Sequence, residues 1–143
     1  MRRFGNAALV YAVLAMAGGV FYREFTKWHG FTEKTTLSVV HTHYFLMGTL
    51  LCLLLLLLEQ RFAFAGKGAG RILAVYHAGL NLTCGMLVVR GVAQVLGTPL
   101  SSGADAAISG LAGIGHILLG CSLILLLVRL RRVLPAGPHR AAP

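Results

Sequence analysis

The sequence predicts an all-α integral membrane protein, a four-helix bundle whose helices run up, down, up and down. Two observations lead to this prediction. The chain has 143 residues, of which 57% are hydrophobic and only 12% are charged, and the apolar residues fall in four long blocks. A soluble domain of ordinary composition has about 25% charged residues. The composition therefore excludes an ordinary soluble protein.

The four apolar blocks are expected to form helices over about 4–25, 36–58, 71–95 and 105–130. Each block reaches the roughly 20 apolar residues that a membrane-spanning helix needs. The first block follows the basic start MRR, as in a signal peptide, but we expect it to be retained as a helix. Because the three connections are short, neighbouring helices should be antiparallel. We expect one domain over 1–132 and a disordered tail over 133–143.

The basic residues indicate the orientation of the bundle. Nine of the 13 lysines and arginines lie on the side that carries the two termini and the second loop, and four lie on the other side. The positive-inside rule then predicts that both termini are cytoplasmic. We expect a multi-pass protein of the bacterial cytoplasmic membrane whose surroundings are the lipid bilayer. The net charge of +9 is explained by this topology, so we do not expect nucleic-acid binding.

Several chemistries have no residues to support them. The three cysteines are each alone in an apolar block, without a CxxC or CxxCH pattern, so neither a zinc finger nor a c-type haem is indicated. The four acidic residues lie at the ends of the blocks, whereas a proton- or cation-coupled transporter usually buries a carboxylate. No nucleophile and base are visibly paired. Whether the protein is an enzyme is left open by the sequence.

Histidines inside the apolar blocks are the strongest functional signal. The stretch SVVHTHYFLMGTL carries His41 and His43, and GLAGIGHILLG carries His116 at a similar depth in the fourth block. A membrane protein rarely places ionisable side chains in hydrocarbon without a use for them. His77 lies nearer the cytoplasmic side, beside Tyr76, and we expect it to hydrogen-bond a neighbouring helix.

His41 and His43 cannot both face one centre, because residues two apart on a helix point about 200° apart. His41 shares a stripe with Gly48, and small residues permit close approach within a bundle. Likewise, His116 has two glycines on its own stripe, Gly113 and Gly120. We therefore prefer His41 with His116 as a pair of ligands, and keep His43 as the substitute for His41.

Two imidazoles from opposed helices suit the iron of a haem b, whose ring the apolar side chains would cover. The propionates would need cations, and Arg90, Arg23 and Lys27 lie on the expected outer side. The first alternative is copper, although a bare metal ion prefers three or four ligands. The second is no cofactor, with histidines that only hydrogen-bond neighbouring helices. Outside this group, His29 beside Trp28 indicates an interfacial anchor, and His139 is expected to be solvated in the tail.

Three segments, GGVFYREFTK, LSVVHTHYFLMGTLLCLLLLLLE and GLAGIGHILLG, resemble a family of small bacterial four-helix membrane proteins known as a numbered domain of unknown function. The likeness covers nearly the whole chain to about residue 130. A weaker, local likeness lies in the H-x-H pattern with a glycine seven residues after the first histidine. It resembles a haem-ligating helix of the haem–copper oxidase superfamily, and implies that His41 ligates haem beside Gly48. Another register would select His43 with Met47. The superfamily's copper-binding histidines are missing, so only haem binding is carried over.

We therefore expect a haem-binding membrane protein that serves electron transfer, haem handling or diatomic gas sensing. Two histidine ligands would fill the iron and favour electron transfer, whereas one would leave a position for oxygen or nitric oxide. The partner would be a redox protein or a gas, and the chain would act as a monomer or a homodimer. The alternatives are a structural or interaction protein with hydrogen-bonded histidines, and a transporter of metal ions or small solutes.

Overall fold

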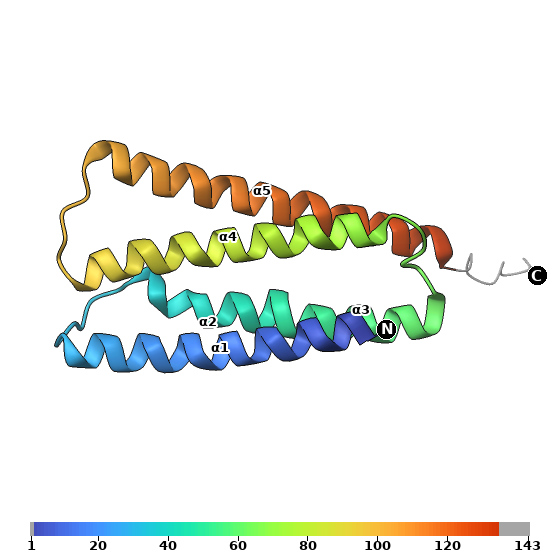
Figure 1. Cartoon of the computed structure of the whole chain (residues 1–143), viewed down its shortest axis with the longest axis horizontal. Coiled ribbons are helices and arrows are strands. Elements are labelled where there is room, and N and C mark those ends of the chain that lie inside the picture. The colour runs from blue at the N-terminus through green and yellow to red at the C-terminus, as the bar shows by residue number, and fades with distance from the viewer. Residues whose placement is uncertain (1, 135–143) are drawn as a thin grey trace, which may run out of the picture.

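The computed structural model describes residues 2–134, and these form four long helical segments that run antiparallel in chain order (Figure 1). The first is α1, Arg2–Trp28, and the last two are α4, Ala69–Val95, and α5, Ser102–Val133. The second segment, Thr36–Phe62, combines η1, Thr36–Val39, α2, Val40–His43, η2, Tyr44–Leu50, and α3, Leu51–Phe62. We call this segment the second span.

The predicted all-helical, four-helix architecture is confirmed, and each helix extends a few residues beyond its apolar block. The four segments have mean hydropathies between 1.7 and 2.4 and are long enough to cross a membrane. At most a third of the most apolar stretch of each is buried inside the molecule. The remaining apolar side chains fit a lipid environment, and the fold is compatible with a multi-pass membrane protein. Of the tail predicted over 133–143, Val133 is the last residue of α5, and residues 135–143, including His139, lie outside the described residues.

The helices pack in the order α1, second span, α4 and α5 (Figure 1). The most extensive contact joins α4 to α5, where two glycines face the partner helix. A Cβ on Gly79 would lie 2.7 Å from the backbone nitrogen of Leu119, and a Cβ on Gly115 would lie 2.8 Å from that of Thr83. Small residues of this kind allow helix backbones to approach closely in a membrane. These two glycines therefore allow α5 to pack closely against α4.

The second span begins with a 3-10 turn that is fastened to α4. The hydroxyl of Thr35 donates to the carbonyl of Gly91 over 3.1 Å, and the hydroxyl of Thr36 donates to the carbonyl of Leu87 over 2.7 Å. Gly91 also makes room for Leu37, because a Cβ there would lie 2.6 Å from its Cγ. These contacts fix the height of the second span against α4, and with it the height of the two histidines that follow.

The middle of the second span is a π-helix, η2, which begins directly after His43. The sequence predicted a regular helix here. A π-helical turn changes the hydrogen-bond ladder from i→i+4 to i→i+5, and neighbouring helices must satisfy carbonyls that the change releases. Tyr76 of α4 does so, since its hydroxyl donates to the carbonyl of Met47 over 2.6 Å. Gly48 of the same segment packs against the ring of Tyr11, where a Cβ would lie 2.5 Å away.

Candidate functional site

The structure brings His43 of α2 together with His116 of α5. Their ring centroids are 6.3 Å apart, and the ring planes are nearly perpendicular at 87°. Both residues lie within the long apolar segments, and the two rings approach each other from different helices. This is the arrangement that the sequence predicted for a histidine pair, with the substitute His43 in the place of His41.

The hydrogen bonds of the two rings fix which nitrogen carries the proton. Nδ1 of His43 lies 2.7 Å from the carbonyl oxygen of Val39, and Nδ1 of His116 lies 2.9 Å from that of Ala112. A carbonyl only accepts, so both Nδ1 atoms must carry a hydrogen. In the neutral imidazoles, Nε2 is then an acceptor with a free lone pair. This is how proteins orient histidines that bind metals through Nε2.

The spacing of the rings suits one metal centre between them. Metal–imidazole bonds are about 2.0–2.1 Å long, so nitrogens on opposite sides of one metal stand roughly 4 Å apart and their ring centres roughly 6 Å apart. Within residues 2–134, no group of three or more histidine, cysteine or acidic side chains could hold a metal ion. The pair can therefore supply two axial ligands, but not the set of three or four that a bare ion prefers.

His41 lies against α1 rather than toward α5. A Cβ on Gly19 would meet its ring at 3.7 Å, and one on Gly18 would meet its Cβ at 3.8 Å. Its Nδ1 is buried without a hydrogen-bond partner among the described residues. The sequence assigned the side of the second span with Gly48 and Cys52 to a cofactor, but the structure places Gly48 on α1 and Cys52 in the core. Gly48 therefore allows the second span to approach α1 closely, rather than a cofactor.

The glycines predicted beside His116 border open space. A Cβ on Gly113 or Gly120 would meet no neighbouring atom within 4 Å, and His116 itself is exposed. These positions leave room beside the His116 ring. On the other side of the pair, a cavity of about 130 Å³ is lined by Thr42, His43, Leu46 and Met47.

Arg90 of α4 lies on the same side of α5 as His116. Its Nη2 donates to the carboxylate of Asp105 over 2.6 Å and to the hydroxyl of Ser109 over 2.8 Å. Ser109 precedes His116 by seven residues, which is two helical turns or roughly 10 Å along the axis. The other two predicted cations lie in the last two turns of α1, near its C-terminal end. Arg23 pairs with the neighbouring Glu24 at 2.7 Å, Lys27 is in the last turn, and no described contact brings either to His116.

A second polar cluster, which the sequence analysis did not assemble, joins α1, the second span and α4. The hydroxyl of Tyr44 donates to Oδ1 of Asn81 over 3.2 Å, and Nδ2 of Asn81 donates to the hydroxyl of Tyr11 over 3.1 Å. That hydroxyl lies 2.9 Å from Nδ1 of His77, so the hydrogen bond expected for His77 is present. Polar residues four apart in an apolar block, as His77 and Asn81 are, were the available signal. Their partners come from distant parts of the chain.

The histidine beside Trp28 is at the surface. Nδ1 of His29 lies 2.8 Å from the carbonyl oxygen of Phe25, and its ring centroid is 4.4 Å from that of Phe25. Trp28 is 77% exposed. The two side chains are placed as an interfacial anchor would be, and away from the other histidines.

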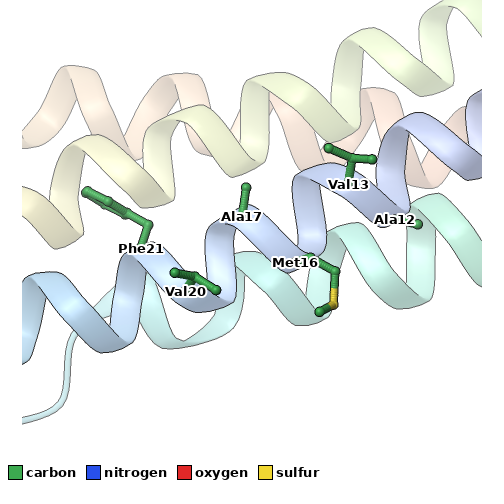
Figure 2. Close-up of a pocket in the computed structure, with 6 residues that line it drawn as sticks. All are labelled: Ala12, Val13, Met16, Ala17, Val20 and Phe21. Atoms are coloured by element: carbon green, nitrogen blue, oxygen red, sulfur yellow. The ribbon is translucent and has the colours of Figure 1, made fainter.

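An apolar groove is lined by residues of α1. Its volume is about 660 Å³, and Figure 2 shows that the side chains lining it consist of carbon and sulfur only. They are Ala12, Val13, Met16, Ala17, Val20 and Phe21. A surface of this kind suits lipid acyl chains and offers a metal no nitrogen or oxygen ligand from a side chain.

Comparison with known proteins gives one match. The family described as "Protein of unknown function (DUF2871)" matches residues 1–133. No curated protein and no solved structure matches the chain. The local likeness to the haem–copper oxidase superfamily has no counterpart in these comparisons.

Proposed function

The chain belongs to the DUF2871 family, and we propose that it holds one haem b between His43 and His116 and serves in electron transfer. The proposal includes the orientation expected from the basic residues, with both termini in the bacterial cytoplasm and the haem in the outer half of the membrane. The sequence preferred His41 as the partner of His116. We now propose His43, because its ring is the one that stands opposite His116.

One observation carries the proposal: the two rings lie 6.3 Å apart, and the Nδ1–H of each is already donated to a carbonyl of its own helical segment. Since each Nδ1–H is donated to a carbonyl, neither Nε2 has a hydrogen to offer the other ring. The two histidines therefore cannot hydrogen-bond to each other, as a purely structural pair would. Protonating one of them would place a charge at membrane depth, which is costly. A metal centre between the Nε2 atoms satisfies both lone pairs.

Haem suits this pair better than a bare ion does. Haem iron needs only two axial protein ligands, which is what the described residues provide. Room for the ring beside His116 would come from the open surfaces at Gly113 and Gly120. Arg90 could serve a propionate, because a guanidinium has five N–H donors and its Nε is buried without a partner among residues 2–134.

Bound haem supplies one-electron chemistry, and the residues of the chain determine how it is used. The carbonyls of Val39 and Ala112 hold the two imidazoles in the tautomer that would ligate a metal through Nε2. Two histidine ligands would leave the iron of a bound haem no open position, which would favour electron transfer over the binding of a diatomic gas. Apolar helices around the site exclude water and so influence the reduction potential.

The experiment is an absorption spectrum of the detergent-purified protein, oxidised and then reduced with dithionite. We expect a Soret band, with sharp α and β bands on reduction, as for a six-coordinate b-type haem. A haem spectrum without the sharp bands would contradict electron transfer through two histidines and favour gas binding. No Soret band, even after addition of hemin, would contradict haem binding. Metal analysis of the same sample would then test copper.

A further inference from the structure

A second candidate site lies between the first turns of α1 and α4, on the side of α4 that faces away from α5. It is a groove of about 230 Å³ lined by Arg3, Phe4, Gly70, Leu73, Ala74 and His77. Gly70 keeps it open beneath the arginine, since a Cβ there would lie 3.7 Å from Nη1 of Arg3. The groove thus has an apolar wall with a polar group at each end.

Hydrogen bonds from three helices determine the tautomer of His77. The amide nitrogen of Asn81 can only donate, and it donates to the hydroxyl oxygen of Tyr11. The hydrogen of Tyr11 is then free to go to Nδ1 of His77, 2.9 Å away. Tyr44 supports this arrangement by donating to Oδ1 of the same amide. With the hydrogen of His77 on Nδ1 instead, the O–H of Tyr11 would have no acceptor among the described residues, so the tautomer that satisfies the cluster carries it on Nε2.

The Nε2–H group of His77 has no acceptor among the described residues, although its side chain lines the groove. Such a donor is costly to leave unpaired against an apolar wall, and a ligand that carries an acceptor would satisfy it. Arg3 adds further N–H donors at the mouth of the groove. The ligand that fits these groups is lipid-soluble, carries oxygen acceptors and has a flat or apolar body that can lie against Phe4 and Leu73.

We propose that this groove binds the ring of a membrane quinone, with one carbonyl oxygen accepting from His77. The volume is smaller than the roughly 300–1,000 Å³ of sites that enclose drug-sized ligands. It therefore suits a single ring whose isoprenoid tail stays in the lipid. An anionic lipid headgroup would use Arg3, but it would not need the hydrogen bonds that lead from His77 to Tyr44.

The inference rests on the proposed function, for which it supplies the redox partner. Gly79 faces α5, and His77 lies two residues before it, about 200° around the helix. The two sites are thus on opposite faces of α4, and Tyr44 of the hydrogen-bonded cluster directly follows His43. Reduction of one quinone to hydroquinone takes two electrons and two protons. If haem is bound as proposed, the electrons would come from the ferrous haems of two copies of the chain, each of which would become ferric, and the protons would come from water at the mouth of the groove.

The test measures binding of a decyl-tailed benzoquinone to the full chain in nanodiscs of zwitterionic lipid, by equilibrium dialysis. We expect His77→Ala to weaken binding at least tenfold. Ala74→Phe should do the same by filling the groove while it leaves every hydrogen bond of the cluster in place. His29→Ala, which changes a histidine outside the groove, should bind as the wild type does.

His116→Ala separates this inference from the proposed function, since it should lose haem and still bind the quinone. Equal binding by the wild type, His77→Ala and Ala74→Phe would overturn the quinone site whatever the haem spectrum is. Displacement of the quinone by phosphatidylglycerol, with loss of lipid binding in Arg3→Ala, would overturn it in favour of a lipid site. In haem-loaded protein, oxidation of the ferrous form by the quinone should be at least tenfold slower in His77→Ala.

Discussion

The two histidine clusters meet in the second span, where His43 belongs to one and Tyr44 to the other, and they differ in how many of their polar atoms have hydrogen-bond partners. Around His77, a tyrosine hydroxyl fills Nδ1, and an asparagine and a second tyrosine complete the cluster. Around His43 and His116, backbone carbonyls take both Nδ1–H groups, and no described residue forms a hydrogen bond to either Nε2.

The comparison indicates that a histidine in a membrane helix is better classified by the hydrogen bond that its Nδ1 makes than by its depth in the membrane. A ring whose Nδ1 accepts from a side chain is part of the packing and presents a donor. A ring whose Nδ1 donates to its own helix presents a lone pair, which suits a metal. The first kind should affect stability when it is removed, and the second kind should affect cofactor binding.

The largest expected effect comes from separating α5 from α4. In Gly79→Leu the new side chain would collide with backbone atoms of α5, because even a Cβ would lie 2.7 Å from Leu119 N and 2.9 Å from Gly115 O. Overpacking costs about 1–3 kcal/mol and more when backbone must move. We expect a lower unfolding temperature in detergent and loss of hemin binding, since His116 moves with α5.

Gly85→Leu is the matched control on the same helix. A Cβ on Gly85 would meet no atom within 4 Å, so this variant should unfold and bind hemin as the wild type does. If Gly79→Leu also behaved as the wild type does, the α4–α5 contact could not be what positions His116.

The next effect separates the two clusters. His77→Ala leaves the hydroxyl of Tyr11 without its acceptor, and interhelical hydrogen bonds in membranes contribute about 0.6 kcal/mol on average and at most about 1.7 kcal/mol. We expect His77→Ala to lower the unfolding temperature and to keep the haem spectrum. His116→Ala should do the reverse, because the side chain is exposed in the chain alone. Thermal unfolding followed by circular dichroism and titration with hemin, each done on both variants, measure this contrast. The contrast would be refuted if the two variants lost the same stability and the same hemin binding.

The smallest effect concerns Arg90. Arg90→Gln removes an ion pair whose acidic side chain is 57% exposed, and exposed pairs contribute about 0.2–1 kcal/mol. The unfolding temperature should fall slightly at low salt, with the difference shrinking at high salt because exposed charges are screened. Arg23→Gln removes a pair between adjacent residues of α1 and should have no effect. Equal effects of the two variants would remove the argument that Arg90 links α4 to α5.

The four helices were predictable because membrane spans have a simple signature, a long apolar block with charges at its ends. The levels of His43 and His116 were predictable too, since depth follows from the rise per residue. The sequence did not predict which side of the second span packs against α1. Gly48 marks a close approach, but the sequence does not say whether a cofactor or a helix comes close, and in the structure it is Tyr11 of α1.

The π-helix and the cluster around His77 escaped the sequence for a related reason. Both depend on partners remote in the chain: Tyr76 takes the carbonyl of Met47, and Tyr11 reaches His77 across 66 residues. The sequence shows that a polar residue is present in a helix, but the packing of the helices determines which residue it bonds to.

The most direct test of the account compares His43→Ala with His41→Ala, each purified with hemin added and then reduced. The two residues are two positions apart, lie in the same apolar segment and differ mainly in the helix that they face. We predict that His43→Ala loses the sharp α and β bands while His41→Ala keeps them. Loss of the bands in His41→Ala alone would contradict the account and return the ligand pair to His41 and His116.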